Sequence, residues 1–204
     1  MIIVITGRQG SGKSTLMKHM IEKEFYGKVE QVTTRPKRDE NDNDYTFVTD
    51  AEFKAMEDHN EFIEIRRYET ASGVWSYGWK KQNFADFWYV TIGDPELWKR
   101  IKKKYPDSKC IYLDLDYDTR AKRCPNREAN EWIRREKADD SLYSAFNTDV
   151  PGIYTFTGEH EIEDVSGKVG ELLMSEFILK HKDDIENGLW NKLGFVDSRN
   201  IPTL

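Results

Sequence analysis

The sequence predicts an α/β fold in which a parallel sheet is flanked by helices, and three observations carry this prediction. Residues 2–6, IIVIT, form a short β-branched run, which is typical of a strand buried on both faces of a parallel sheet. A glycine-rich turn and a helical pattern follow, and strands then alternate with helices along most of the chain. Short strands cluster only between about residues 33 and 80, which predicts an inserted β-rich subdomain.

Each further element follows from a local pattern. β-branched and aromatic runs predict strands at residues 28–34, 45–49, 61–69, 87–92, 109–116 and 152–157. Apolar residues at helical spacing predict helices at residues 14–25, 51–59, 95–104, 117–147 and 169–182. Residues 72–79, SGVWSYGW, are expected to form a turn or hairpin. Asp50 is the expected cap of the helix 51–59, and Pro125 is the expected break within 117–147.

Composition narrows the possible functions. The chain of 204 residues is 38% apolar and 33% charged, which suits one domain with a real core and a strongly solvated surface. Its net charge of -6 argues against general nucleic-acid binding, because that activity favours a basic surface. Cys110 and Cys124 indicate neither a disulfide framework nor a metal site. The apolar start is too short for a signal peptide or a membrane span, so we expect a cytoplasmic protein.

The motif that carries chemistry is the stretch 7–14, GRQGSGKS, which fits G-x-x-x-x-G-K-[ST]. Its glycines let successive backbone N–H groups surround phosphate oxygens, and the following helix directs its positive end at the same phosphates. Lys13 is expected to reach the β- and γ-phosphates of ATP, and the Ser14 hydroxyl to help hold Mg²⁺. The expected ATP contacts are Gly7, Gln9, Gly10, Ser11, Gly12, Lys13, Ser14 and Thr15.

A GTPase is the first alternative for such a loop. It needs an N-K-x-D motif to read the base, and residues 191–194, NKLG, lack the carboxylate. We interpret that match as chance.

The segment 33–47, TTRPKRDENDNDYTF, indicates where an acceptor would be held. A kinase needs a second site, and an acceptor that is itself a phosphate monoester requires arginines to neutralise it. Arg35 and Arg38 follow a predicted strand, and the Tyr45 hydroxyl is close enough in sequence to donate to the same phosphate. The acidic residues 39–44 are expected to form a solvated turn.

Five motifs in order resemble the guanylate kinase family. They are GRQGSGKST at 7–15, TTRPKR at 33–38, DYTFV at 44–48, EFIE at 61–64 and YG at 77–78. The resemblance is well spaced from residue 3 to about 80 and continues more weakly to about 175. It implies a phosphate-loop kinase fold with an acceptor-binding insert and a lid that closes over ATP.

The resemblance also assigns roles to individual positions. Arg35, Arg38, Tyr45 and Tyr77 match the residues that hold the acceptor's phosphate. Glu64 matches the carboxylate that accepts from guanine, a role that suits an acceptor-only group. Asp94 matches the remaining carboxylate of a D-x-D pattern near the acceptor.

Two positions depart from the family pattern. Gln31 and Trp79 stand where the family has small hydroxyl residues that help to read the base. The phosphate grip is therefore expected to be intact, while the acceptor's base and sugar stay open.

Residues 120–135, RAKRCPNREANEWIRR, contain five arginines. They could form a charged helical surface, or a mobile lid whose arginines stabilise the transferring phosphoryl group. The family has a lid at this place, and Arg123, Arg127 and Arg135 fit its arginines best.

We therefore expect a single kinase domain over residues 1–182 and a C-terminal tail of unknown role over 183–204. Its parts are a core, an acceptor-binding insert and a lid region. They span residues 1–32, 86–118 and 148–182 for the core, 33–85 for the insert, and about 119–147 for the lid.

The expected activity is transfer of the γ-phosphoryl group of MgATP to GMP, dGMP or a related nucleoside monophosphate. The expected partners are small-molecule nucleotides, with no nucleic acid and no membrane, and monomer and homodimer are not distinguished. One alternative is a phosphate-loop kinase of a sugar phosphate, which the missing base-reading hydroxyls favour and Glu64 opposes. The other is a guanylate-kinase-like protein-binding module without turnover, which the retained Lys13 and Ser14 oppose.

Overall fold

The structure, a computed structural model, describes residues 1–23, 26–37, 39–40, 42–70, 73–84 and 88–183. The chain divides into two compact units, residues 1–162 and 163–204. The first unit contains every strand of the described residues, and the second consists, where it is described, mainly of helix α6 (Ile162–Lys180). None of the described helices combines the length and the apolar character that crossing a bilayer requires.

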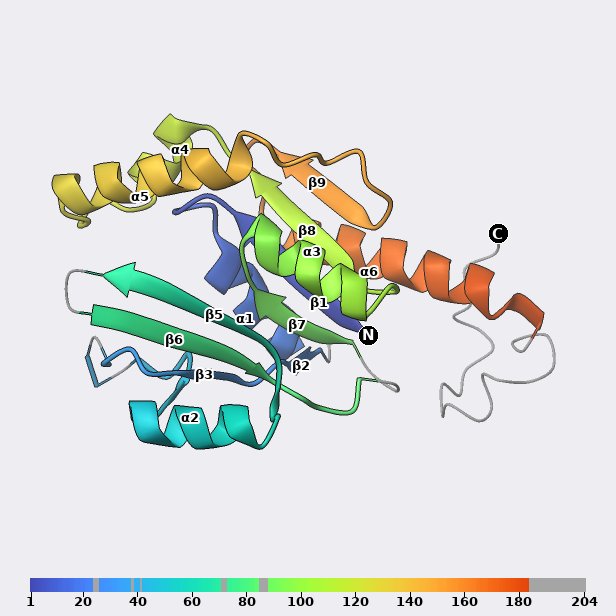
Figure 1. The fold of residues 1–204 in the computed structure, drawn as a ribbon. Helices are drawn as coiled ribbons and strands as arrows, with labels where there is room; N and C mark the ends of the chain where they lie inside the picture. Colours follow the sequence, from blue (N-terminus) through green and yellow to red (C-terminus); the bar gives the residue numbers. More distant parts are fainter. Residues whose placement is uncertain (24–25, 38, 41, 71–72, 85–87, 184–204) are drawn as a thin grey trace. The chain divides into compact units, whose positions relative to one another are not determined.

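The first unit is built on a parallel sheet, as the sequence predicts. Its described strands lie in the order β2 (Gly27–Lys28), β7 (Tyr89–Ile92), β1 (Ile2–Gly7), β8 (Lys109–Asp114) and β9 (Ile153–Thr157) (Figure 1). Every pairing in this sheet is parallel. The central strand β1 is buried along its whole length, which explains its unbroken apolar run.

A second sheet comes from the segment between β2 and β7. It has the order β4 (Thr46–Phe47), β3 (Gln31–Thr33), β6 (Gly73–Lys80) and β5 (Phe62–Thr70). Strand β6 pairs antiparallel with both β3 and β5, whereas β3 and β4 are parallel. This sheet confirms the prediction that short strands between about 33 and 80 form a β-rich insertion.

One local prediction was wrong in this region. The single strand expected at residues 28–34 is two short strands, β2 and β3, which belong to different sheets. Hydrophobic alternation cannot reveal this division, because both pieces are β structure and only their long-range partners differ. Residues 72–79 were expected to form a turn or hairpin, and from Gly73 onward they form strand β6, which pairs antiparallel with β5.

The helices follow the predicted order. The first unit contains α1 (Lys13–Lys23), α2 (Asp50–Asp58), α3 (Pro95–Lys104), α4 (Tyr117–Lys122) and α5 (Ala129–Tyr143). The cap of α2 is Thr49, not Asp50, because Thr49 and Glu52 form a reciprocal capping box. The break between α4 and α5 includes Pro125, as expected, and α6 begins at Ile162 rather than at residue 169.

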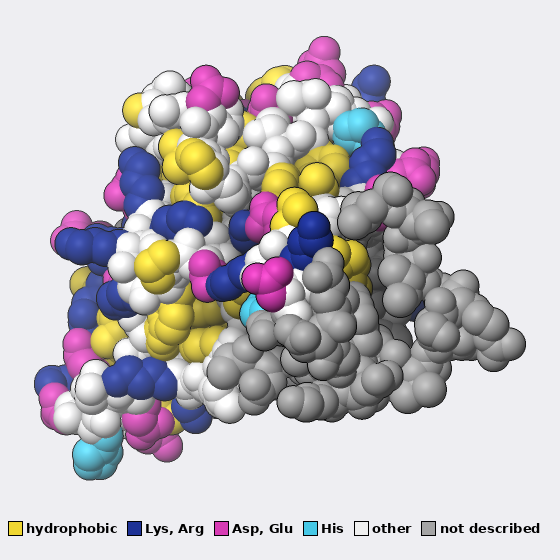
Figure 2. Space-filling view, turned by 90° about the vertical axis from the view of Figure 1, so that its right-hand side faces the viewer, with side chains coloured by type: hydrophobic (Ala, Val, Ile, Leu, Met, Phe, Trp, Pro, Cys, Tyr) yellow, Lys and Arg dark blue, Asp and Glu magenta, His cyan; other side chains and the backbone are white. Residues whose placement is uncertain are grey.

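Helix α3 links the two sheets, because it contacts both β1 and β5. Its buried residues Leu97, Trp98 and Ile101 share one hydrophobic cluster with Val4 of the parallel sheet and Trp79 of the second sheet. A separate cluster joins α2 to the second sheet. On the face shown in Figure 2, basic and acidic side chains are interspersed among the described residues.

Candidate active site

The phosphate loop connects β1 to α1, as its sequence predicts. Gly10 has a φ of 74°, and a Cβ at this residue would lie 2.8 Å from the backbone oxygen of Arg120. A Cβ at Gly7 would lie 2.6 Å from the Oγ of Ser11. The loop therefore needs glycine at both positions, for backbone conformation and for space.

Lys13 lies at the centre of this loop. Its Nζ donates to the backbone oxygens of Gly7 at 2.6 Å and Arg8 at 2.9 Å. Burial lowers the pKa of Lys13 to about 8; Asp139 opposes this shift, and neighbouring arginines add to it. In this structure the ammonium is folded onto the loop, where an anionic ligand would offer it a stronger acceptor.

Hydroxyl groups of the loop are also placed for a ligand. Ser14 and Thr15, at the start of α1, are exposed. The Ser11 Oγ is buried and has no hydrogen-bond partner among the described residues. A buried hydroxyl without a partner is uncommon, and a polar ligand bound in this loop would supply the hydrogen bond that the Ser11 hydroxyl lacks.

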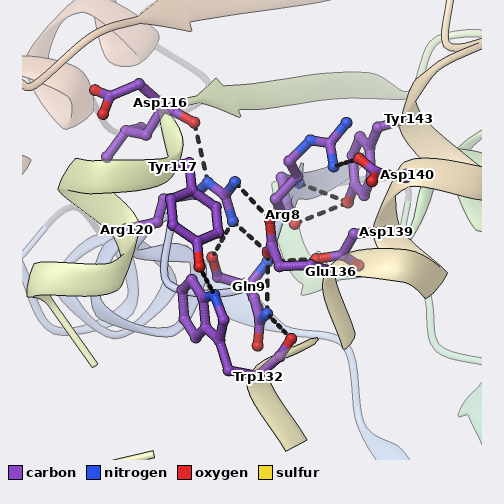
Figure 3. Close-up of polar contacts among 12 residues, drawn as sticks. Arg8, Gln9, Asp116, Tyr117, Arg120, Trp132, Glu136, Asp139, Asp140 and Tyr143 are labelled. Carbon is purple, nitrogen blue, oxygen red and sulfur yellow. Dashed lines mark hydrogen bonds and ion pairs between the residues drawn. The ribbon is translucent and has the colours of Figure 1, made fainter. Parts of the chain in front are cut away.

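Helix α5 is tied to the phosphate loop by a polar network that the sequence did not predict (Figure 3). The Gln9 backbone N–H donates to Asp139 Oδ2 at 2.7 Å, and its side chain donates to the Trp132 carbonyl and to Glu136 Oε1. The Tyr143 hydroxyl accepts from the Gly7 N–H at 2.9 Å. These α5 residues recur every three or four positions, so they share one face of the helix.

Arg120 is the buried centre of this network, and sequence reasoning did not select it. It is 3% exposed and makes a bidentate pair with Glu136, at 2.6 and 2.9 Å. It also donates to the backbone oxygens of Gln9 and Leu115. No local pattern separates Arg120 from its exposed neighbours, because its role depends on partners on other segments, Glu136 of α5 and Gln9 of the phosphate loop.

The three predicted lid arginines differ in where they point. Arg127 donates to the Gln9 side-chain oxygen at 2.9 Å. Arg123 NH1 would lie 3.6 Å from a Cβ at Gly12, and its NH2 pairs with Glu159 at 3.1 Å. The Arg135 Nε instead donates to Glu131 on its own helix, at 2.6 Å. The structure thus brings Arg123 and Arg127 to the phosphate loop.

On the second sheet, Arg35, Tyr45 and Tyr77 lie together. The Arg35 guanidinium lies 5.4 Å from the centre of the Tyr45 ring, and the Tyr45 and Tyr77 rings meet edge to face at 5.7 Å. Arg38 falls outside the described residues. The expectation of a solvated acidic turn was wrong for Asp42, because its carboxylate is buried and pairs with Arg35 NH2 at 2.9 Å. Sequence reasoning could not foresee this pairing, since exposed and paired carboxylates look alike.

Glu64 is buried on β5, and its two carboxylate oxygens already have partners. Arg100 donates to Oε1 and Lys104 to Oε2, each at 2.9 Å, both from α3. Burial raises the pKa of Glu64, but the hydrogen bonds from these two cations outweigh burial and lower it overall. The predicted base-reading carboxylate is therefore charged and held by internal cations.

Asp94 caps α3 and joins a second cluster. Its carboxylate accepts from the Leu97 N–H at 2.7 Å, from Arg66 at 2.9 Å and from the Tyr68 hydroxyl at 3.2 Å. Sequence reasoning missed Arg66 and Tyr68. Alternation along β5 could have found them, because residues 64, 66 and 68 face the same side of a strand.

The two positions that depart from the family pattern are buried. Trp79 is 4% exposed and donates from Nε1 to the Thr91 Oγ1 at 2.9 Å. Gln31 pairs with Trp79 in the register of β3 and β6 and is also buried. Trp79 thus belongs to the hydrophobic core between the sheets.

Comparison with known proteins identifies the family and the fold. The guanylate kinase family model matches residues 1–141. The chain is 26% identical over 176 residues to a guanylate kinase of Prochlorococcus marinus, covering 84% of this chain and 94% of that protein. It is 28% identical to a guanylate kinase of Thermotoga maritima, over 91% of this chain and 92% of that protein. The crystal structure of guanylate kinase from Anaplasma phagocytophilum has the same fold, with a TM-score of 0.60 at 20% identity, covering 86% and 85% of the two chains.

A phosphate loop that connects a central parallel strand to a helix defines a phosphate-loop nucleotide-binding protein. Within that class, the chain belongs to the guanylate kinase family.

Proposed function

We propose that the protein transfers the γ-phosphoryl group of MgATP to a nucleoside monophosphate, GMP, dGMP or a related nucleotide. The observation that carries this proposal is the presence in the first unit of two separate sites that contain basic side chains. One is the phosphate loop with Lys13, Arg123 and Arg127, and the other is the cluster of Arg35, Tyr45 and Tyr77. A kinase requires one such site for each phosphate-bearing substrate.

On the donor side, the loop's N–H groups and Lys13 would bind the ATP phosphates. Lys13 exchanges its backbone acceptors for phosphate oxygens, which stabilise its charged form. Arg123 and Arg127 lie at the loop and would neutralise charge on the transferring group.

The residues present also fit Mg²⁺. Ser14 is exposed at the start of α1 and would provide a hydroxyl ligand, while the phosphates and water would complete the coordination. Bound Mg²⁺ supplies charge neutralisation at the phosphates.

On the acceptor side, Arg35 and the two tyrosine hydroxyls would hold the acceptor's phosphate, with Arg38 as a further proposed contact. The attacking atom is an acceptor phosphate oxygen, which forms the new P–O bond as the bond to ADP breaks. Since that oxygen is already anionic, the reaction requires no general base from the protein. The chain's task is to position the two substrates and neutralise their charge.

A coupled assay of ADP formation with MgATP and each ribo- and deoxynucleoside monophosphate tests this proposal. We expect ADP with at least one of them, and a fall in kcat/KM of about a hundredfold or more in Lys13→Ala. Arg67→Ala is the control. Arg67 lies on the same strand as Glu64, and it forms a largely exposed ion pair with Glu57 of helix α2. No ADP above the acceptor-free rate with any nucleotide would contradict the proposal.

One observation favours the second candidate, a sugar phosphate kinase. Glu64 is the residue that opposes it, yet both Glu64 oxygens already accept from Arg100 and Lys104. Thermal shifts with GMP and with ribose phosphates would separate the two candidates. Stabilisation by a ribose phosphate alone would favour the second.

A further inference from the structure

The carboxylate of Asp139 is bonded to the phosphate loop itself. Its Oδ2 accepts the backbone N–H of Gln9 at 2.7 Å (Figure 3). Gln9 is the third residue of the motif that begins at Gly7. Backbone N–H groups of such a loop are anion donors, and a carboxylate oxygen resembles a phosphate oxygen in charge and in accepting geometry.

The charges around Asp139 match those that a phosphate would meet. Lys13 and Arg8 interact favourably with its carboxylate, and Glu136 interacts unfavourably. Burial outweighs these favourable interactions and raises the pKa of Asp139, so the surroundings compensate its negative charge only in part. The groups that interact with this internal anion are the ones that would interact with a bound phosphate.

The placement of Asp139 does not depend on the Gln9 contact alone. On the same face of α5, the Trp132 carbonyl and the Glu136 carboxylate accept from the Gln9 side chain. The Tyr143 hydroxyl, at the end of the helix, bonds to both the N–H and the carbonyl of Gly7. These contacts hold α5 against the loop and bring the Asp139 carboxylate to its N–H group.

We propose that Asp139 is an internal competitor for the phosphate loop, which a bound polyphosphate must displace, so that this side chain sets the affinity for ATP. The inference rests on the proposed function, because it takes ATP as the ligand of the loop. Displacement frees the Gln9 N–H for a phosphate oxygen and removes a negative charge from beside Lys13. It also breaks one of the bonds between α5 and the loop, which couples ATP binding to the position of the lid region.

Titration calorimetry with MgATP tests this inference on the full-length protein. Asp139→Ala removes the competing carboxylate, and we expect its Kd for ATP to fall about tenfold, the effect of one charge-assisted hydrogen bond. Asp139→Asn keeps the shape and an oxygen for the Gln9 N–H but loses the charge, so its Kd should fall by a smaller factor. This isosteric variant preserves the test if the alanine variant does not fold.

The matched control is Glu128→Gln. Glu128 is the N-cap residue of the same helix and makes no side-chain capping bond, so its substitution removes one negative charge without touching the loop. Its Kd should equal that of the wild type. Tighter binding in both Asp139 variants and not in the control supports the inference.

Failure of the inference can be told apart from failure of the proposed function. If the wild type binds ATP and the folded Asp139→Asn variant binds it no more tightly than Glu128→Gln, the competitor role is wrong. If neither the wild type nor any variant binds ATP, the proposed function is wrong. Thermal melting of each variant confirms that the comparison is made between folded proteins.

Discussion

At the scale of single residues, the charged groups of the candidate site hold internal partners. Arg35 is paired with Asp42, and Glu64 with Arg100 and Lys104. A buried charge left without a partner is strongly destabilising, so such pairs keep the ligand-free protein stable. Ligand binding at these residues then exchanges one partner for another, and its affinity depends on the difference between them.

Lys13 gives a pH prediction at this scale. Its pKa is lowered to about 8 in this structure, and the proposed binding of ATP would favour its charged form. The Kd for MgATP should therefore be nearly constant between pH 7 and 8 and should rise up to about tenfold per pH unit above 8. Calorimetry from pH 7 to 9.5 measures this. Lys13→Arg stays charged across that range and should show a flatter profile; an equally steep profile would assign the titration to another group.

Arg35 gives a prediction about the acceptor. Arg35→Lys retains the charge but loses the planar set of donors, so we expect the KM for the acceptor to rise about tenfold, with a smaller change in kcat. Steady-state kinetics at saturating MgATP measure both constants. An unchanged acceptor KM, or an increase confined to the KM for ATP, would contradict the proposed role of Arg35 in binding the acceptor.

At the scale of elements, helix α5 depends on the buried pair of Arg120 and Glu136. Glu136→Ala would leave Arg120 charged and unpaired, and we expect it to lower the free energy of unfolding by about 3 kcal/mol. Urea denaturation measures this change. Arg134→Ala breaks a largely exposed pair with Glu131 and should change stability by less than about 1 kcal/mol. Similar effects of the two substitutions would show that the α5 network contributes little stability.

Helix α2 offers a simpler prediction. Thr49→Ala removes the hydroxyl that accepts from the Glu52 N–H and donates to the Glu52 carboxylate, and should destabilise the protein by about 1 kcal/mol. Thr49→Ser keeps the hydroxyl and should retain most of the stability. Thermal melts of the two variants suffice. Equal stability of the alanine variant and the wild type would mean that the cap is replaced by water at no cost.

The elements also show what sequence can predict. The bounds of α3 agree with the prediction of 95–104, because its apolar spacing, its cap and its N-terminal proline are all local signals. The division of 28–34 into β2 and β3 escaped prediction, since it depends on which sheet each piece joins. The same limit applies at the site. The loop motif locates Lys13, whereas the partners of Arg120, Glu64 and Asp139 lie on other elements and are fixed by the tertiary fold.

At the scale of the first unit, the proposed ATP site lies on the parallel sheet and the proposed acceptor site lies on the inserted sheet. Helix α3 contacts both sheets. The phosphate loop follows β1 of the parallel sheet, and Arg35, Tyr45 and Tyr77 belong to the inserted sheet and its connections. Five motifs in order predict this arrangement and the family, but they do not predict the base. Glu64, Gln31 and Trp79 are all buried, and the Glu64 and Trp79 side chains form hydrogen bonds within the protein.

Transfer of the γ-phosphoryl group from ATP to an acceptor phosphate is tested most directly by ³¹P NMR of the reaction. With MgATP and the best acceptor from the coupled assay, we expect the γ-phosphate signal of ATP to fall while the signals of ADP and the acceptor's diphosphate rise together in equal amounts. Loss of the γ-phosphate signal to inorganic phosphate alone, with the acceptor unchanged, would contradict the account.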